Sequence, residues 1–276
     1  MQPNHLINHS KVLQSIQKIE KSNPLVLSLT NHVVMNFTAN ALLSIGASPL
    51  MSLAADEMDE LVNISHAVVI NIGTLNSCFL ECSFEAAKAA IKYKKPVILD
   101  PVGVGASQLR SQAVQDILET GAVTLLKGNA SEVIAIGNLT SPATSKGVDS
   151  SHSTDEAIAS AIEIAKKYKI CVAITGPTDV VVNEQYIGYI DLNVPMMTKV
   201  TGTGCTAAAL CGAFSSCDDD AFVAAFSTLF TMSLVGNEAQ KQTKAPGSFA
   251  TAFIDGLSQI TPEMVMNMSG VFIEEH

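Results

Sequence analysis

The chain has 276 residues, of which 47% are hydrophobic and 15% charged, and its formal net charge at pH 7 is −10. This composition is enough to bury the core of an α/β protein, and we expect a single domain over residues 1–276. The negative charge argues against a nucleic-acid partner, because phosphate backbones are bound by clustered Lys and Arg. No apolar run reaches the roughly 18 residues that span a bilayer, and residues 1–20 lack the apolar middle of a signal peptide, so we expect a cytoplasmic protein without membrane contact.

Short apolar runs alternate with helical segments over much of the chain. Five runs are continuously apolar, which is typical of parallel strands covered on both faces. Helical segments such as Asp56–Ser65 and Phe79–Tyr93 lie between them. This rhythm is typical of βαβ units, and it predicts an α/β fold with a mostly parallel sheet. The five predicted strands are Leu25–Thr30, His66–Asn71, Pro96–Asp100, Ala122–Lys127 and Ile170–Thr175.

The pattern changes after the fifth strand. Asp179–Asn183 and Tyr186–Ile190 are predicted strands separated by only two residues. Such a short link predicts an antiparallel hairpin, since a parallel pair needs a long crossover. From Cys205 onward, Ala-rich sequence predicts a mostly helical C-terminal part, with the charges of Asp218–Asp220 at a helix N-terminus. One long polar loop is predicted at Asn138–Ser153.

Ligands of open parallel α/β sheets bind beyond the carboxyl ends of the strands, so the residues that follow each strand are the candidates for chemistry. Asp100 ends one predicted strand and is followed by Pro101–Gly105, a segment with two glycines. A carboxylate at this edge is a candidate ligand for Mg²⁺, directly or through water. A capping or turn-forming Asp is the alternative, and both interpretations stand at this point.

A second group follows the next strand. Lys127 ends that strand, and Asn129 stands three residues before Glu132, as in a capping box at the start of a helix. The same residue types also suit a nucleotide phosphate and its metal ion. The spacing alone leaves the structural and the functional interpretation open.

The most specific group is the loop Thr201–Thr206, which leads into an Ala-rich predicted helix. Gly202 and Gly204, flanked by hydroxyl residues, would expose several N–H groups at the positive end of the helix dipole. We interpret the loop as an anion hole that stabilises charge during phosphoryl transfer; the alternative is a tight turn without a ligand. The spacing matches neither a Walker loop nor a dinucleotide-binding fingerprint.

Cys205 lies at the start of the same predicted helix. A helix N-terminus lowers the pKa of a thiol, so we expect thiolate character near neutral pH. Two roles follow: a base towards a substrate hydroxyl, or a residue that shapes the pocket. The other cysteines have no paired C-x-x-C spacing, and we assign them to packing as free thiols: Cys78, Cys82, Cys171, Cys211 and Cys217.

Taken together, these segments resemble the hydroxyethylthiazole kinase family, a branch of the ribokinase-like superfamily. Leu29–Asn40 resembles the family signature T-N-x-V-V-x-x-F-T-A-N, and Gly46–Met51 resembles G-A-S-P-x-M. Each segment is weak alone, but their shared order along nearly the whole chain is a specific signal. The further counterparts are Asn71–Leu75, Asp100–Ala106, Lys127–Glu132, Thr175–Gly176, Thr201–Cys205 and Pro246–Phe249.

The resemblance implies a three-layer α/β/α ribokinase-like fold and an enzyme that uses ATP and Mg²⁺. The implied reaction phosphorylates the primary hydroxyl of 4-methyl-5-(2-hydroxyethyl)thiazole in thiamine biosynthesis or salvage. The resemblance also implies a homotrimer with thiazole pockets between subunits. Cys205, Gly202 and Gly204 would form the catalytic loop, with Cys205 where most ribokinase-like enzymes carry Asp. The other implied contacts are Asn31, Met51 and Gly202 for the thiazole, Lys127, Thr175 and Asn129 for ATP, and Asp100 and Glu132 for Mg²⁺.

Two other functions are compatible with parts of this pattern. Another ribokinase-like enzyme, such as a hydroxymethylpyrimidine kinase or an ATP-dependent nicotinamide-hydrate dehydratase, is expected to carry Asp in place of Cys205 and to lack the two N-terminal segments. A binding module that holds a nucleotide without turnover would be favoured by loss of Asp100, Glu132 or the glycine loop. All three features are present, so the sequence favours the kinase.

Overall fold

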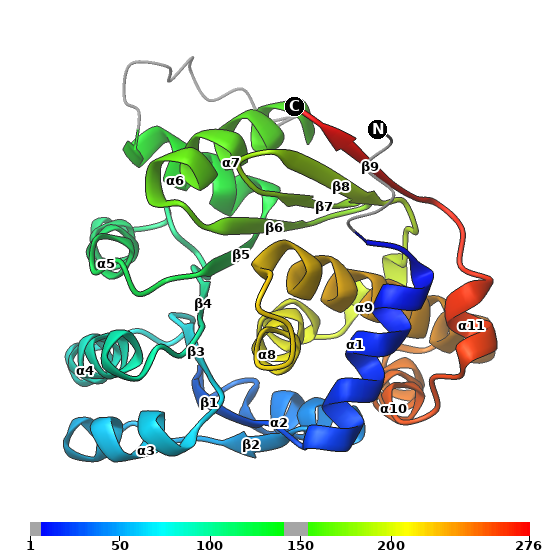
Figure 1. The fold of residues 1–276 in the computed structure, drawn as a ribbon, viewed down its shortest axis with the longest axis horizontal. Helices are drawn as coiled ribbons and strands as arrows, with labels where there is room; N and C mark the ends of the chain where they lie inside the picture. Colours follow the sequence, from blue (N-terminus) through cyan, green and yellow to red (C-terminus); the bar gives the residue numbers. More distant parts are fainter. Residues whose placement is uncertain (1–6, 141–153) are drawn as a thin grey trace.

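A nine-stranded sheet forms the centre of the described structure (Figure 1). The computed structural model describes residues 7–140 and 154–276. The strand order is β2-β1-β3-β4-β5-β6-β7-β8-β9, with parallel pairing from β2 to β6 and antiparallel pairing from β6 to β9. The strands are β1 Leu25–Leu29, β2 Ser48–Leu50, β3 Ala67–Asn71, β4 Val97–Asp100, β5 Leu125–Asn129, β6 Cys171–Thr175, β7 Asp179–Val182, β8 Tyr186–Ile190 and β9 Val271–Glu275.

Helices cover both faces of the sheet, which gives three layers (Figure 1). On one face α3 to α7 pack over one apolar core, and on the other α8 and α9 pack with α1, α2, α10 and α11 over a second core. The α-helices are α1 His9–Ser22, α2 Met35–Ser44, α3 Met58–Ile64, α4 Ser77–Tyr93, α5 Gln108–Glu119, α6 Ala130–Thr140, α7 Thr154–Tyr168, α8 Thr203–Ser215, α9 Ala221–Gln242, α10 Pro246–Leu257 and α11 Pro262–Met266.

Helix α8 lies directly against the central strands. A Cβ atom added at Gly212 would be only 2.8 Å from methyl carbons of Val26 and Val69, so a side chain at this position would push α8 off β1 and β3. Since Gly212 contacts Val26 near the start of β1, and Cys205 contacts Asn31 just beyond its end, α8 runs antiparallel to β1. The N-terminus of α8 therefore lies at the carboxyl edge of the sheet.

The predicted α/β fold is confirmed, and each of the five predicted parallel strands has a counterpart within a few residues. The largest shift is at β5, which begins at Leu125 instead of Ala122 and continues to Asn129. The predicted hairpin is β7 and β8, and Asp220 caps α9 through bonds to Phe222 and Val223. The predicted loop Asn138–Ser153 begins too early, since residues 138–140 form the last turn of α6, and the rest of it lies outside the described residues.

Two strands were not predicted. β2 has three residues with Pro49 at its centre, too few for a periodic pattern. β9 interrupts the C-terminal part, which was predicted to be mostly helical, and its residues alternate between half-buried and exposed. Both lie at edges of the sheet, where one side of the backbone has no neighbouring strand. Edge strands of this kind carry little of the hydrophobic signal on which strand prediction depends.

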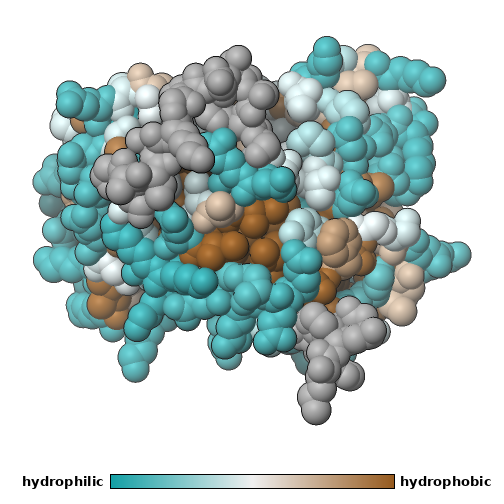
Figure 2. Space-filling view, turned by 90° about the horizontal axis from the view of Figure 1, so that it is seen from above, coloured by the Kyte–Doolittle hydropathy of each residue, from teal (hydrophilic) through white to brown (hydrophobic). Residues whose placement is uncertain are grey.

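The face at the top of Figure 1 has an apolar centre surrounded by polar residues (Figure 2). In β9, Phe272 is 51% exposed and stacks on Tyr189 of β8 with ring centroids 4.4 Å apart. Among the described residues, no helix combines the length and apolar character needed to cross a membrane.

Candidate active site

The residues selected from the sequence converge on the carboxyl edge of the parallel sheet. Asn71 and Asp100 are register partners at the ends of β3 and β4, and Asn129 and Thr175 are register partners at the ends of β5 and β6. Asn31 follows β1 by two residues, and Met51 directly follows β2. The edge rule for open α/β sheets thus brings together residues that are far apart in the sequence.

A buried ion pair lies at the centre of this edge. Lys127 donates from Nζ to Oδ1 of Asp100 at 3.4 Å, and both side chains are almost fully buried, at 4% and 0% exposure. Burial raises the pKa of Asp100 to about 6, against the opposing charge of Lys127. Burial lowers the pKa of Lys127, but the carboxylates of Asp100 and Glu132 outweigh it and raise that pKa overall. Charges buried with so few partners are more typical of a functional site than of a core.

A chain of hydrogen bonds joins this pair to Cys205. Asn71 donates from Nδ2 to Oδ2 of Asp100 at 2.6 Å, and its Oδ1 accepts from Nδ2 of Asn31 at 2.9 Å. Asn31 Nδ2 in turn donates to Sγ of Cys205 at 3.5 Å. Asn31 and Asn71 are both buried, so these contacts are shielded from water. The four side chains form one connected polar cluster behind the start of α8.

The predicted thiolate character of Cys205 is wrong for this structure. Burial raises the pKa of the Cys205 thiol, and the charge of Asp100 raises it further. Lys127 and hydrogen bonds from Asn71 and Asn31 lower the pKa, but they do not compensate. The sequence showed the helix N-terminus and not the neighbouring carboxylate or the burial, which oppose its effect.

The predicted capping box at the start of α6 is present. The backbone N–H of Glu132 donates to Oδ1 of Asn129, and the backbone N–H of Asn129 donates to Oε2 of Glu132, both at 2.9 Å. The other carboxylate oxygen, Oε1, accepts the backbone N–H of Gly103 at 3.0 Å. Glu132 therefore caps α6 and also holds the loop that follows Asp100.

Arg110 holds the same loop from the opposite side. Its guanidinium donates to the carbonyls of Ile72 and Val102 at 2.7 and 2.6 Å and to that of Gly73 at 2.9 Å. One side chain from α5 thus joins the ends of β3 and β4. Arg110 was not among the predicted site residues, because no local pattern marks a long side chain that reaches back to backbone carbonyls.

The glycine loop at the start of α8 has the backbone geometry that the sequence suggested. Gly202 is the N-cap residue with φ 92°, a conformation that other residues rarely adopt. A Cβ atom at Gly204 would be 3.3 Å from Nζ of Lys127, so the ammonium group lies directly behind the loop. The first turn of a helix has N–H groups without intrahelical acceptors, and together with Lys127 they favour an anion here.

A pocket of about 190 Å³ adjoins the loop on the side of β6. Its lining includes Thr175, Thr203, Gly204 and Asp179. Oδ1 of Asp179 accepts the backbone N–H of Gly176 at 3.0 Å, and Oδ2 accepts the hydroxyl of Ser233 at 3.0 Å. Burial raises the pKa of Asp179 to about 6. Asp179 was predicted only as the start of a strand, although it lies at the same edge of the sheet as Thr175.

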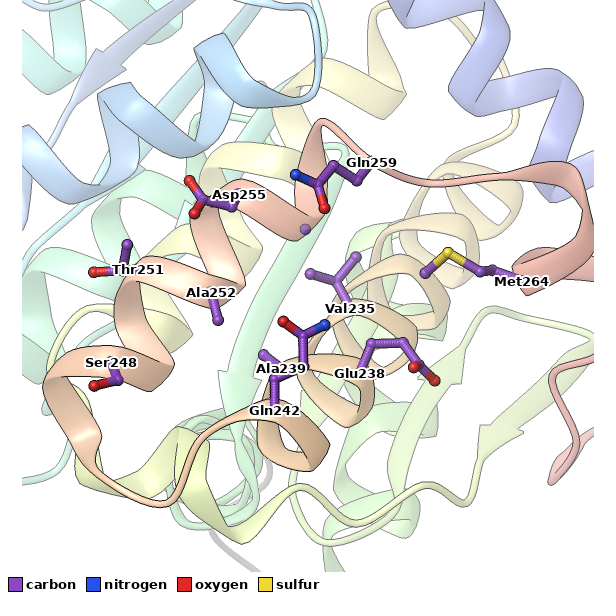
Figure 3. Close-up of a pocket in the computed structure, with 11 residues that line it drawn as sticks. Val235, Glu238, Ala239, Gln242, Ser248, Thr251, Ala252, Asp255, Gln259 and Met264 are labelled. Carbon is purple, nitrogen blue, oxygen red and sulfur yellow. The ribbon is translucent and has the colours of Figure 1, made fainter.

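A larger concavity lies elsewhere, between α9, α10 and α11 (Figure 3). It has a volume of about 490 Å³, and Glu238 and Gln242 on α9 lie opposite Ser248, Thr251 and Asp255 on α10. Asp255 and Thr251 are exposed to solvent. None of the residues selected from the sequence for chemistry lines this pocket.

The side chains at the carboxyl edge of the sheet offer part of the ligand set that a divalent cation needs. The charge of Glu132 is close enough to raise the pKa of Asp100, and a cation beside these two carboxylates would relieve their repulsion. Carboxylate oxygens are the ligands that Mg²⁺ prefers, and each oxygen of Glu132 keeps a second lone pair beyond its bond to a backbone N–H. Within residues 7–140 and 154–276, no cluster of three or more His, Cys, Asp or Glu side chains suited to a metal is present.

Comparisons with known proteins agree on one family. A model of the hydroxyethylthiazole kinase family matches residues 16–263. The hydroxyethylthiazole kinase of Leptospira biflexa is 41% identical over 261 residues, covering 95% of this chain and 96% of that protein, and that of Carboxydothermus hydrogenoformans is 43% identical, covering 92% and 94%. A solved structure of a hydroxyethylthiazole kinase protein from Pyrococcus horikoshii has a TM-score of 0.88 at 33% identity, covering 97% of this chain and 99% of that one.

Proposed function

The chain belongs to the hydroxyethylthiazole kinase family, and from this premise we propose that it transfers the γ-phosphoryl group of ATP to the primary hydroxyl of 4-methyl-5-(2-hydroxyethyl)thiazole. The product is the thiazole phosphate ester, as thiamine biosynthesis or salvage requires. The observation that carries this proposal beyond the family is the buried Lys127–Asp100 pair directly behind the glycine loop of α8.

Transfer is a displacement at the γ-phosphorus. The substrate oxygen forms the new O–P bond as the β–γ bridging bond breaks, ADP leaves with the bonding electrons, and the hydroxyl proton is released to water. The catalysis that a protein contributes to such a reaction is mainly positioning and stabilisation of charge. We propose that the backbone N–H groups of Gly204 and Cys205 face the equatorial oxygens of the transferred group, and that Lys127 supports them electrostatically from behind.

The nucleotide is proposed to occupy the pocket of about 190 Å³ beside the loop. Thr175 and Gly204 line this pocket, and Lys127 lies behind Gly204. We propose Lys127, Thr175 and Asn129 as the residues nearest the ATP phosphates. Asp100 and Glu132 are proposed to hold Mg²⁺, which when bound would neutralise the charge of the triphosphate.

The thiazole alcohol is proposed to bind on the other side of the loop, against Asn31, Met51 and the backbone of Gly202. Cys205 separates the two sides, since Asn31 contacts its sulfur and Gly204 adjoins the nucleotide pocket. Because its pKa is raised, Cys205 enters the reaction as a thiol. We therefore propose that Cys205 orients the attacking hydroxyl rather than removing its proton as a preformed thiolate.

We also propose that the whole chain is one kinase domain and that it assembles into a homotrimer with thiazole sites between subunits. The apolar surface beside the site supports this assembly. Val33, just before α2, is 68% exposed, and Leu43, within α2, is 58% exposed. A trimer would have three times the mass of the 29.0 kDa chain in light scattering. A cytoplasmic location is proposed as well, and the free thiols at all six cysteines accord with a reducing compartment.

The proposed function is tested by ADP release from MgATP with 4-methyl-5-(2-hydroxyethyl)thiazole, beside hydroxymethylpyrimidine, pyridoxal and ribose. Turnover with the thiazole alone is the expected result. Turnover with another acceptor would keep the kinase and discard the substrate. No turnover by folded protein that binds ATP would favour a binding module instead.

A further inference from the structure

Asn71, the last residue of β3, bonds several groups of the site, although the family resemblance gave it no role. Its side chain is 1% exposed, and its immediate neighbours Ile70 and Ile72 are apolar and fully buried. Nδ2 donates to Asp100, and Oδ1 accepts both from Nδ2 of Asn31 and from the backbone N–H of Gly73, the latter at 3.0 Å. A single amide at a core position thus bonds three separate groups.

Each of these bonds fixes the orientation of the next side chain, starting from Asp100. The ionised carboxylate of Asp100 accepts hydrogen bonds only, so Asn71 must turn its NH₂ group towards it and its oxygen away. That oxygen requires a donor, so Asn31 must present its own NH₂ group. The second hydrogen of the Asn31 amide then points to Sγ of Cys205, while its oxygen accepts the backbone N–H of Val33 at 3.1 Å.

We propose that Asn71 is a positioning residue for phosphoryl transfer, which transmits the orientation set by Asp100 through Asn31 to the Cys205 sulfur. The inference rests on the proposed function and assigns this residue a role in the same site. Asn71 makes no contact with substrate in this role. It couples the metal-side carboxylate to the thiol on the acceptor side, so that both are aligned when the two substrates bind.

The close packing of Asn31 supports a requirement for alignment rather than simple filling of space. A Cβ atom at Gly73 would be 2.7 Å from Nδ2 of Asn31 and 2.9 Å from its Cβ and Cγ. The absence of a side chain at Gly73 allows Asn31 to reach both Asn71 and Cys205. The backbone of Gly73 is itself held by Asn71 and, through its carbonyl, by Arg110.

The informative substitution is Asn71→Asp, which keeps the shape and replaces the only donor by an acceptor. A carboxylate at this position would face Asp100 and would reverse the order of donors and acceptors along the cluster. We expect kcat to fall about 30- to 100-fold, as for loss of a buried hydrogen bond to a charged group. KM for the thiazole alcohol should rise about fivefold through Asn31, while KM for ATP should stay within about twofold, since Asn71 does not line the nucleotide pocket.

A second measurement does not depend on turnover. Asn71 and Asn31 both lower the pKa of the Cys205 thiol, Asn31 through its bond to the sulfur, so loss of this arrangement should slow alkylation of Cys205 by iodoacetamide. Mass spectrometry of the peptide that contains Cys205 measures this rate, and exposed Cys78 provides an internal standard. We expect the Cys205 rate to fall at least about threefold and the Cys78 rate to stay unchanged.

The matched control is Asn76→Asp, the same chemical change five residues further along the chain. Asn76 is exposed and caps α4 through a bond to Phe79, and Asp is as good a cap as Asn. This variant should match the wild type in both measurements. If Asn71→Asp does not fold, Asn71→Ser removes the long amide without adding charge, and the same decrease in kcat and alkylation rate is expected.

The inference is overturned if a folded Asn71 variant keeps kcat within about twofold of wild type, or if its Cys205 is alkylated as fast as in wild type or faster. A wild-type enzyme that does not phosphorylate the thiazole alcohol would overturn the proposed function instead. In that case the alkylation rates still decide whether Asn71 orients Cys205.

Discussion

Two concave regions of this molecule differ in size and in chemistry. The cavity between α9 and α10 has a volume of about 490 Å³, and the pocket at the carboxyl edge of the sheet about 190 Å³. In the larger cavity Asp255 and Glu238 lie on facing helices (Figure 3), Asp255 is exposed, and Glu238 pairs with Lys241 one turn further along α9. Beside the smaller one, Asp100 and Lys127 are paired with almost no access to water.

This difference shows that buried charge, rather than volume, marks the candidate site. An ion pair on the surface costs little desolvation free energy and contributes little to stability, so the pair of Glu238 and Lys241 requires no functional explanation. A buried pair such as Lys127 and Asp100 carries a large desolvation penalty, and well-packed apolar residues would often be as stable in its place. Its presence at the edge where ligands of α/β sheets bind is therefore best explained by catalysis.

The largest effect is expected for Lys127→Met. This substitution tests whether the buried pair serves catalysis or only the fold. The substitution leaves Asp100 buried without its cation, and we expect a loss of about 3 kcal/mol in the free energy of unfolding. Loss of electrostatic support behind the glycine loop should lower kcat about 100- to 1000-fold. Urea unfolding and an ADP-release assay measure the two effects.

The double variant Lys127→Met/Asp100→Asn separates stability from catalysis. It removes both charges and keeps the shape of the Asp side chain, so its stability should return to within about 1 kcal/mol of wild type. Its activity should remain lost. A double variant that regains activity along with stability would show that the pair supports the fold alone.

A second comparison uses one substitution in each region. Gly202→Ala places a side chain at φ 92° with its Cβ 3.1 Å from Val34, and we expect a decrease in kcat of about 10- to 100-fold as the loop shifts. Gly247→Ala in α10 meets open space, and its activity should equal that of wild type. Equal activity of the two variants would mean that the conformation of the glycine loop is unimportant for transfer.

The third prediction concerns pH and Asp179. Its pKa is about 6 in the folded protein against an ordinary value of 3.8, so the folded state binds this proton more tightly than the unfolded state. Relative to Asp179→Asn, the wild type should therefore lose about 1–3 kcal/mol of stability as pH rises from 4 to 7. Denaturant unfolding of both proteins at pH 4.5 and 7.5 measures the change, and a constant difference would contradict the burial of this charge.

The smallest effect is expected in the larger cavity. Glu238→Gln/Asp255→Asn removes both of its carboxylates while the shape of the cavity stays nearly unchanged. Because surface charges of this kind contribute little, kcat and KM should stay within about twofold of wild type. A decrease of more than about tenfold would make this cavity part of the enzyme's working surface and would undo the distinction between the two regions.

Much of the site was predictable because its residues stand at strand ends. Asp100 and Thr175 end β4 and β6 as predicted, and parallel strands bring such ends to one edge, whereas Lys127 was predicted to end its strand and lies two residues before the end of β5. Asn71 ends the run His66–Asn71 in the same way, so the edge rule also points to Asn71, although the family resemblance gave it no role. The glycines of the α8 loop were informative because a helix start exposes its N–H groups.

The rest of the site depends on distances that the sequence does not contain. The raised pKa of Cys205 arises from burial and from Asp100, which is more than one hundred positions away in the chain. Arg110 reaches carbonyls of two loops, and no periodic pattern marks such a contact. β9 was missed because the side chains of an edge strand are half exposed and carry little apolar signal.

The measurement that tests the central claim most directly is hydrogen–deuterium exchange of the wild-type protein with and without MgADP plus the thiazole alcohol. Ligand binding at the sheet edge should slow exchange in peptides covering residues 127–132 and 198–206, which contain the start of α6 and the glycine loop. Peptides covering 238–259, which line the larger cavity, should exchange as in the free protein. Protection confined to residues 238–259 would contradict the account, because the ligands would then bind in the larger cavity.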